Sequence, residues 1–448
     1  MNFLKRQLNR FKTIKEYPSA IFGIAIIAIL IITSILTIIF IPYETAVSLW
    51  RGGQVWQEYP RNARPVWMDW FTGNDLPRTL NIDSRDLEGM QIVEDLNGTK
   101  QFEIELPFTY EYDGFPKEIN LFLESEFEDN SPFASITWIT PDGREYESRE
   151  FSVGESRNFR FGRDDNIQSA FPGQDIHQAL LSDPDQDEMV PLKGDYKVRI
   201  SGYLFEEDST LAARNVLYGQ IHGLAGTDHR RRDLLISLLW GTPIALMFGV
   251  LAAVGTTITT LIVAAIGVWY GGWFDSLIQR ITEVNLILPV LPILVMVGLF
   301  VSRSLWLMLA VLILLGIFSA GVKNYRAMFL QIKDSAFIEA AQAYGASNKR
   351  IIFFYLIPKI IPTLIPTFIT AIPTYIFMEA SLAMLGLGDP VLPTWGKVLN
   401  DAYENGALYL GHYYWILQPA VLLMITGLGF AMTGFALDRI FNPRLRRL

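Results

Sequence analysis

The 448-residue chain is half hydrophobic, and 19% of its residues are charged. This composition is typical of a membrane protein and argues against a large soluble protein. The net charge of −9 is unevenly distributed: residues 42–226 contain 34 acidic and 16 basic residues, whereas the remainder contains 12 acidic and 21 basic ones. The chain has no cysteine, so disulfides and thiolate metal sites are excluded. An acidic, water-facing block is therefore joined to a basic membrane part.

The first predicted element is a transmembrane helix at 21–41. The run IFGIAIIAILIITSILTIIFI carries no charge and is long enough to cross a bilayer core of about 30 Å. Five basic residues precede it: Lys5, Arg6, Arg10, Lys12 and Lys15. Because positive flanks stay inside, we expect a cytoplasmic N-terminus. Residues 1–42 are thus interpreted as a cytoplasmic tail and a first span.

Residues 43–225 are expected to form an inserted extracytoplasmic domain that is rich in β-structure. QFEIELPF and DYKVRISGYLF alternate apolar and polar residues, and SITWITPDGREYESREFSV predicts two strands joined at Pro141-Asp142-Gly143. A small β-sandwich is the expected fold. The acidic stretch SDPDQDEMV does not fit a helix–loop–helix calcium site, because Glu188 replaces the required glycine. We interpret it as a solvated loop.

Residues 226–448 contain the other predicted spans, which makes six in all. Six spans place both termini in the cytoplasm, and the basic C-terminal tail with Arg439, Arg444, Arg446 and Arg447 agrees with this orientation. One feature opposes it, because Arg230, Arg231 and Arg232 would lie outside. The expected fold is an all-α polytopic membrane protein with one β-rich insertion. Its later spans are expected near 243–269, 281–301, 305–321, 361–385 and 415–437.

A polar segment interrupts the apolar spans at 323–359. We expect Asp334 and Ser335 to cap a short helix through Tyr344, Gly345 to end it in the left-handed conformation, and Ser347 to cap a second helix. Pro358 is expected to break the pattern before the fifth span. The predicted helix–turn–helix is a docking element by shape, with no nucleophile, metal cluster or phosphate cradle.

The spacing of this segment resembles the signature loop of ABC importer permeases: Glu-Ala-Ala, three residues, Gly, nine residues, then Ile-x-Leu-Pro. Glu339-Ala340-Ala341, Gly345 and Pro358 match, while Tyr355 and Ile357 depart from the pattern with bulky apolar residues. The resemblance implies that the 338–358 loop, with Ser347, docks on an ATPase subunit. A plain alanine-rich cytoplasmic hairpin is the structural alternative.

Further stretches resemble the dipeptide/oligopeptide/nickel permease group. GLAGTDHRRRDLL matches its LGTDxxGRD segment, with Arg231 where glycine is usual and Pro243 where arginine is usual. EASLAMLGLGDPVLPTWGKVLNDA resembles its loop after span five, and NPRLRRL its tail. The resemblance covers residues 222–448 and not the insertion. It implies transport of peptides or similar small solutes, and members of the group carry dipeptides, longer peptides, nickel chelates or oligosaccharides.

The resemblance also implies partners and a location. A second related permease, two ATPase subunits that hold ATP and magnesium, and an extracytoplasmic substrate-binding protein would complete the importer in a prokaryotic inner membrane. The sequence has no G-x-x-x-x-G-K-[ST] phosphate loop, so we expect no cofactor, metal or catalytic residue on this chain. It is interpreted as a transport subunit and not as an enzyme.

Charged residues at the spans are the candidates for the solute pathway or its gate, because an unpaired charge in lipid is costly. These candidates are Glu283, Glu379, Asp228 and Asp233. The structural alternative pairs Arg280 with Glu283 at i, i+3 and lets Glu379 face water at the outer boundary. Two other functions stay open at this point: a membrane-anchored enzyme with its site in the acidic outer domain, or an ion-coupled secondary transporter, which usually shows inverted repeats.

Overall fold

The computed structural model describes residues 17–73, 75–87, 89–96, 99–186 and 188–441. The N-terminal tail before Tyr17, with its five basic residues, lies outside the described residues, as do Asp187 and the tail from Asn442 on with Arg444, Arg446 and Arg447. The chain forms two compact units, one made of Gly52–Leu235 and the other of Met1–Arg51 with Ile236–Leu448.

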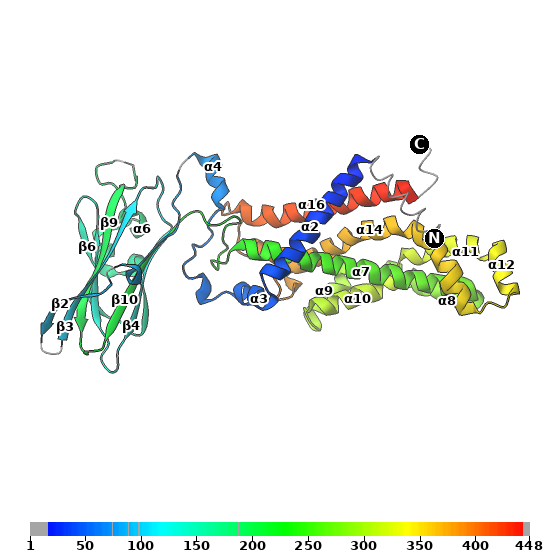
Figure 1. The fold of residues 1–448 in the computed structure, drawn as a ribbon, viewed down its shortest axis with the longest axis horizontal. Coiled ribbons are helices and arrows are strands. Elements are labelled where there is room, and N and C mark those ends of the chain that lie inside the picture. The colour runs from blue at the N-terminus through cyan, green and yellow to red at the C-terminus, as the bar shows by residue number, and fades with distance from the viewer. Residues whose placement is uncertain (1–16, 74, 88, 97–98, 187, 442–448) are drawn as a thin grey trace. The chain divides into compact units, whose positions relative to one another are not determined.

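The Gly52–Leu235 unit contains two antiparallel sheets that share one hydrophobic core (Figure 1). One sheet has the order β1-β10-β4-β8, with bounds Leu80–Asp83, Thr210–Tyr218, Glu118–Glu126 and Ser156–Arg160. The other has the order β2-β3-β9-β5-β6, with β7 paired to β5. Its bounds are Gln91–Leu96, Thr99–Tyr110, Gly194–Leu204, Phe133–Ile139, Glu145–Glu147 and Phe151–Ser152. These two sheets agree with the β-rich structure predicted for this region.

Strand burial follows the apolar alternation in the sequence. In β3, Phe102, Ile104 and Leu106 are fully buried, whereas the intervening Glu103 and Glu105 pair with Arg199 and Lys197 of β9 on the other face. Such a period of two puts every second side chain into the core. The short helices of this unit are η2 Gln54–Trp56, η3 Val66–Met68, α4 Asp69–Thr72, η4 Ser84–Asp86, η5 Phe161–Arg163, α5 Asp165–Ala170 and α6 Ile176–Ala179.

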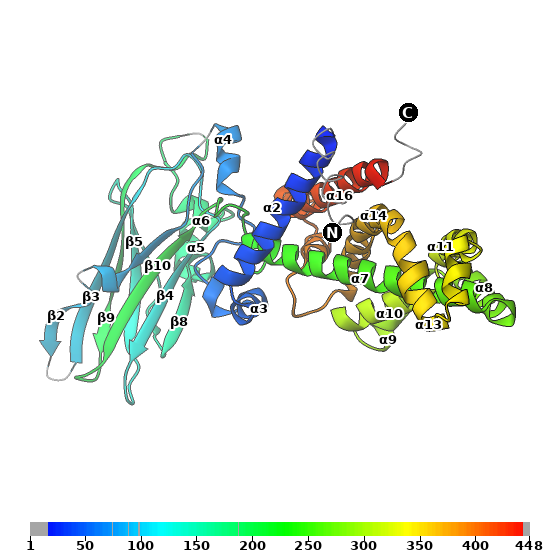
Figure 2. The same cartoon turned by 45° about the vertical axis from the view of Figure 1, so that its right-hand side comes forward.

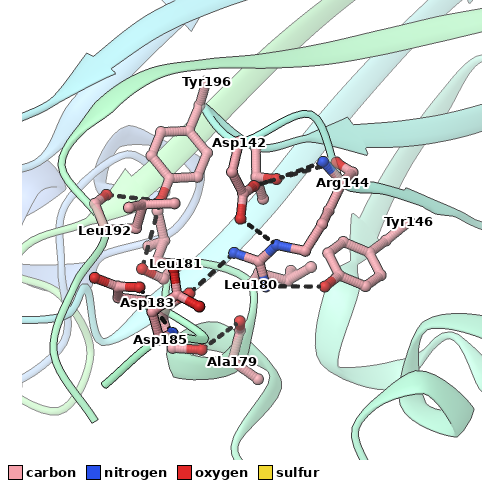
Figure 3. Close-up of polar contacts among 12 residues, drawn as sticks. Asp142, Arg144, Tyr146, Ala179, Leu180, Leu181, Asp183, Asp185, Leu192 and Tyr196 are labelled. Atoms are coloured by element: carbon pink, nitrogen blue, oxygen red, sulfur yellow. Dashed lines mark hydrogen bonds and ion pairs between the residues drawn. The ribbon is translucent and has the colours of Figure 1, made fainter.

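The acidic loop that follows α6 is held by an arginine of the predicted Pro-Asp-Gly turn (Figure 3). Arg144 donates through Nε to Asp142 at 2.6 Å and through Nη2 to the Ser182 carbonyl at 3.2 Å. The Asp185 amide donates to Asp183 at 3.0 Å, which closes a local turn. Within the described ranges no group of His, Asp or Glu side chains is arranged to hold a metal ion.

The helical unit contains long apolar helices. Four described helices are long and apolar enough to cross a membrane, or six if each of two bent helix pairs counts as one span. The pairs are α8 Gly272–Ile287 with α9 Val290–Phe300, bent by 76°, and α10 Leu305–Ile317 with α11 Ala320–Lys333, bent by 44°. The remaining elements are α2 Pro18–Phe40, α3 Tyr43–Arg51, α7 Leu234–Tyr270, α12 Ala336–Ala343, α13 Asn348–Arg350, α14 Ile357–Leu382, α15 Trp395–Glu404 and α16 Tyr413–Phe441.

The expected third span at 281–301 coincides with the bent pair, and the helix breaks between α8 and α9. The proline at 289 has no N–H to continue the ladder, and it takes an extended conformation as the N-cap of α9. The expected break at Pro358 is wrong. A π-helical stretch, Ile351–Leu356, joins α13 directly to α14. Its shifted hydrogen bonds let the chain pass Pro358 without ending the helix.

Helix α16 packs against both α14 and α2 in the helical unit. Helices α3 and α12 lie at opposite ends of this unit (Figures 1 and 2). Near α3, Trp240 donates its indole N–H to the Ile41 carbonyl at 3.2 Å and contacts Tyr43 edge to face. These contacts explain why α3 belongs to the helical unit, whereas residues 43–51 were expected in the outer domain.

Candidate functional site

The segment that resembles a coupling loop forms a helix, a sharp turn and a second helix. Gly345 has φ +81°, so it ends α12 in the left-handed conformation that glycine adopts without strain. Ser347 accepts a hydrogen bond from the Arg350 amide at 3.4 Å, as a capping residue does. The expected capping by Ser335 is wrong, because its hydroxyl donates to the Ile332 carbonyl instead.

One apolar residue of α12 anchors this hairpin to the spans. Ile338 is 1% exposed and belongs to a cluster, here called the anchor cluster, that draws on α7, α8, α11, the π-helical stretch and α14. The neighbouring positions Glu339 and Ala340 are exposed, and Tyr344 is 93% exposed at the end of the helix. The hairpin therefore has a fixed inner side and an open outer side of small and polar residues. The buried members of the anchor cluster are Leu261, Ala264, Ala265, Val268, Ile278, Val322, Tyr325, Phe329, Ile338, Ile351, Ile352, Leu356, Ile360 and Leu364.

Ion pairs join α8 to α11. Arg326 of α11 donates to both carboxylate oxygens of Asp275 on α8, with distances of 2.6–2.9 Å. Glu283 pairs with Arg280 at 3.4 Å, which confirms the structural alternative for that residue, and also with Lys323 at 3.6 Å. The second partner lies on α11 and is not visible as a sequence spacing. Such partly exposed pairs position helices and contribute little stability.

Glu379 lies in the interior of the helical unit. Its side chain is buried, at 4% residue exposure, and hydrogen-bonds to Thr394 at the start of α15. The alternative that it faces water at the outer boundary is wrong. A buried carboxyl group needs a polar partner, and here that partner belongs to the segment Pro393-Thr394-Trp395-Gly396 singled out in the sequence.

The same segment packs tightly against α7. Trp395 is 1% exposed and donates its indole N–H to the Leu238 carbonyl at 2.9 Å. A Cβ atom on Gly241 would lie 2.2 Å from the Trp395 ring, and one on Gly396 would lie 2.7 Å from the Ala380 backbone. Both glycines permit a close approach that any larger residue would prevent. The structure thus brings together family-like residues from positions that are distant in the sequence.

Asp228 and Asp233 stabilise the turn that precedes α7. Asp228 is fully buried, accepts from the amides of Arg230 and Arg232 at 2.8 and 2.9 Å, and forms an ion pair with the Arg232 side chain at 2.6 Å. Asp233 accepts from the Leu235 amide at 2.8 Å at the start of the helix. Burial raises the pKa of Asp233, and that amide bond offsets part of the rise. Both aspartates therefore have a structural part in this turn.

Arg231 replaces the usual glycine at the tightest point of this turn. Its φ is +68°, a left-handed conformation that is costly for residues with a Cβ. The side chain compensates, because it donates to Glu118 and to the Tyr59 carbonyl at 2.6 Å each and lies 4.1 Å from the centre of the Tyr218 ring. Of the three arginines that opposed the predicted orientation, Arg232 is thus paired with Asp228 and Arg231 with Glu118.

Replacing Arg231 tests this compensation. Arg231→Ala keeps the left-handed strain and loses the ion pair, so we expect it to destabilise the turn by about 2–3 kcal/mol. Arg231→Gly also loses the pair but removes the strain, so it should be milder by about 1 kcal/mol. Hydrogen exchange of peptides that cover 226–235 measures both effects. Equal protection of the two variants would contradict the role assigned to φ.

The same pair predicts a pH dependence. Burial alone would raise the pKa of Glu118, but the Arg231 guanidinium and hydrogen bonds from Asn120 and Arg231 hold it below the ordinary value. The pair therefore stabilises the fold fully above the ordinary carboxyl pKa and loses this effect as the pH falls through the lowered one. The acid sensitivity of hydrogen exchange at 226–235 should be smaller in Arg231→Ala than in the wild type.

A polar cavity of about 480 Å³ lies among α7, α11 and α14. None of the described residues that line it carries a formal charge. Tyr375 lies within hydrogen-bond distance of the Thr256 hydroxyl, at 2.9 Å, and Thr260 donates to the Gly316 carbonyl at 3.0 Å. The polar lining, here called the neutral groove, consists of Thr256, Thr257, Thr260, Ser319, Asn324, Tyr325, Gln331, Thr363, Thr367 and Tyr375.

The four charged candidates do not line the neutral groove, and our sequence analysis missed the residues that do. A signal for them was present. Asn324 and Gln331 are seven residues apart on α11, and Thr363 and Thr367 are four apart on α14, which places each pair on one helix face. Uncharged polar residues attract less attention in a hydrophobic helix than charged ones, although they too need partners there.

Comparison with known proteins identifies the family. The sequence model described as "Binding-protein-dependent transport system inner membrane component" matches residues 257–447. The chain is 30% identical over 224 residues to the oligopeptide transport system permease protein OppC of Bacillus subtilis, covering 50% of this chain and 72% of that protein. It is 32% identical over 225 residues to the glutathione transport system permease protein GsiD of Escherichia coli, covering 49% of this chain and 72% of that protein.

A third relative is the dipeptide transport system permease protein DppC of Bacillus subtilis, 30% identical over 223 residues, with 50% of this chain and 69% of the relative covered. These matches agree with the apolar helices of the helical unit. The chain therefore belongs to the binding-protein-dependent transport system inner membrane components, the permease subunits of ABC importers.

Proposed function

We propose that this chain forms half of the translocation pathway for peptides or similar small solutes and that the 338–358 hairpin couples it to a separate ATPase. The coupling role is supported by the hairpin itself, which is exposed at Glu339 and Ala340 and packed against the other helices through Ile338. The names of the relatives, which refer to oligopeptides, dipeptides and glutathione, support a peptide-like solute.

The anchor cluster gives the hairpin a mechanical route to the spans. Ile338 packs among residues of α7, α11 and α14, and Tyr325 and Leu364 belong both to this cluster and to the wall of the neutral groove. Because a packed interior transmits displacement with little compression, movement of α12 shifts the helices that form the groove. ATP binding on a partner would in this way change access to the solute pathway.

We propose the neutral groove, in place of the four charged candidates, as this chain's share of the pathway wall. The amides of Asn324 and Gln331 and the hydroxyl of Thr367 would be costly against lipid, because nothing there accepts or donates hydrogen bonds. Facing a water-filled pathway, they are satisfied. Hydroxyl and amide groups can exchange hydrogen bonds with the backbone of a passing peptide without selecting for side-chain charge.

The complete importer requires other chains. A second related permease would form the other half of the pathway, two ATPases would hold ATP and magnesium, and an extracytoplasmic binding protein would deliver the solute. With each bent pair counted as one span, six spans would put both termini in the cytoplasm of a prokaryotic cell and the β-rich unit outside, which is the orientation we propose. This chain then needs no cofactor of its own.

Reconstitution tests the proposed energy source. Uptake into vesicles that contain the complex purified from native membranes should require ATP and persist when ionophores dissipate ion gradients. Uptake that stops when the ion gradient is dissipated and does not depend on ATP would instead establish a secondary transporter. Peptide hydrolysis by the chain alone, with no uptake, would establish an enzyme.

Cysteine accessibility tests the pathway wall, and the natural chain has no cysteine to interfere. Thr367→Cys lies in the neutral groove, whereas Met424→Cys is a matched position on an exposed apolar face of α16. Because the thiolate that reacts needs water, a membrane-impermeant thiosulfonate should label Thr367→Cys roughly tenfold faster or more. Equal labelling of the two variants would exclude the groove as a wetted pathway.

A further inference from the structure

The Gly52–Leu235 unit has a cavity of about 510 Å³ at the edge of its four-stranded sheet. It is formed by β8, η5 and the start of α5, together with Arg149 and Phe151. This size lies within the range of specific binding pockets. Six charged residues line it: Arg149, Arg157, Arg160, Arg163, Asp164 and Asp165.

The arginines contrast with the composition of the domain around them. Residues 42–226 contain only 16 basic residues against 34 acidic ones, and four of these basic residues meet at this cavity. The cavity lining has four arginines and two aspartates, a net charge of +2, whereas residues 42–226 as a whole have a net charge of −18.

The two aspartates leave most of this positive charge uncompensated. Asp164 accepts from the amides of Asn166 and Ile167 at 3.0 and 3.1 Å as the cap of α5, and Asp165 pairs with Arg149 at 3.1 Å. Within the described part of the chain, no carboxylate lies at ion-pair distance from the other three arginines. These are Arg157, Arg160 and Arg163, here called the arginine triplet.

One guanidinium of the triplet is already held in position. Arg157 donates through Nη1 to the Ser152 carbonyl at 2.7 Å, and its guanidinium carbon lies 4.2 Å from the centre of the Phe151 ring. That ring in turn stacks on Phe159 with a centroid distance of 5.3 Å. A planar guanidinium fixed on an aromatic face keeps donors for a carboxylate and loses little entropy when it binds one.

The strand that carries two of these arginines is an edge strand. β8 pairs with β4 on one side, and in the described sheet it has no ladder partner on the other. Backbone groups at such an edge can pair with an extended segment from another protein. The cavity thus offers both carboxylate recognition and a template for an extended chain.

We infer that the arginine triplet and the β8 edge dock an extended acidic segment of the soluble binding protein that delivers solute. This inference rests on the proposed function, which requires such a protein. Because residues 42–226 have a net charge of −18 and the cavity lining one of +2, charge complementarity favours docking of an acidic segment at this cavity.

A labelled peptide tests the recognition chemistry on the full-length protein in lipid nanodiscs. Fluorescein-labelled hexaglutamate should bind saturably, more weakly as salt rises, and the combined variant Arg157→Glu, Arg160→Glu, Arg163→Glu should reduce its affinity at least about tenfold. Arg78→Glu, an exposed arginine of the same unit outside the cavity, should change it less than about twofold. Equal binding of hexaglutamate to all three proteins, or of hexaglutamine to the wild type, would overturn the inference.

A single variant keeps the test valid if the triple variant does not fold. Arg163→Glu alone, at an exposed position, should weaken hexaglutamate binding by about threefold. A photoreactive amino acid at Asn158 in native membranes then tests the source of the segment. We expect a cross-link to an acidic peptide of the solute-binding protein, identified by mass spectrometry, whereas cross-links only to the partner permease or to lipid would overturn it.

Uptake measured on the same preparations separates two kinds of failure. If ATP-driven uptake is absent in the wild type, the proposed function is wrong. If uptake is present but hexaglutamate binding does not depend on the arginine triplet, the proposed function stands and the docking site is wrong.

Discussion

Ala340→Arg is expected to reduce ATP-driven uptake at least about tenfold and to remove the ATPase from the purified complex, because a docked interface cannot bury an unpaired charge without a cost of several kcal/mol. Ala340 is exposed on α12, on the side of the helix opposite the buried Ile338. The variant should therefore fold normally and fail only in docking. Uptake into vesicles and the ATPase content of the affinity-purified complex measure the two effects.

The matched control is Gln342→Arg on the same helix. Gln342 is also exposed but lies on the flank nearer Ile338, away from the outer side of the hairpin. This variant adds the same charge and should keep most of the uptake. If both arginine variants transport normally, α12 is not a docking surface; if both fail with normal ATPase content, the added charge acts elsewhere.

Gly241→Leu is expected to destabilise the helical unit more than any other single change considered. A Cβ atom at this position would already lie 2.2 Å from Cδ1 of Trp395, and the indole cannot move without breaking its bond to the Leu238 carbonyl. Trp395→Ala removes the indole from the same contact and should lower the free energy of unfolding by about 3–5 kcal/mol. Aggregation temperature in detergent, followed by size-exclusion chromatography after heating, measures both losses.

Two variants separate this contact from a general effect of size. Val250→Leu enlarges an exposed residue of the same helix and should leave the aggregation temperature unchanged. In the double variant Gly241→Ala with Trp395→Phe, the smaller ring should recover part of what Gly241→Ala loses alone, because the two sites are in contact. Simple additivity of the two single variants would contradict the packing described here.

Regular periodicity was the part of the fold that could be predicted. The apolar runs near Ile21 and Pro243 and the alternation of Phe102, Ile104 and Leu106 each reflect a local rule that neighbouring chain segments do not change. Gly345 and Ser347 were predictable for the same reason, since a left-handed glycine and a capping serine act within one turn.

Features that depend on distant partners were not predictable. Pro358 alone indicates a helix end, and only the π-helical stretch Ile351–Leu356 before it allows the helix to continue. The buried position of Glu379 was not predictable, because its partner Thr394 lies at the start of the next helix. Arg231 departs from the expected glycine, and its compensation by Glu118 comes from a strand more than a hundred residues earlier.

The candidate site shows the same division. The motif residues Glu339, Ala340, Ala341 and Gly345 could be located by spacing, because the whole hairpin is local in sequence. The neutral groove could not, because it forms only when α7, α11 and α14 pack together. Uncharged threonine, asparagine and glutamine residues give no distinctive signal in the sequence. They form a candidate pathway wall only because the fold places them around one cavity.

Replacing Tyr344, which is 93% exposed at the end of α12, by a photoreactive amino acid in native membranes tests the coupling role most directly. Irradiation should give a covalent product in which position 344 is joined to a peptide of an ATPase subunit, because this residue stands at the end of the proposed docking helix. If the ATPase is present in the same membranes and position 344 joins only to lipid or to no protein, the hairpin is not where ATP hydrolysis drives this permease.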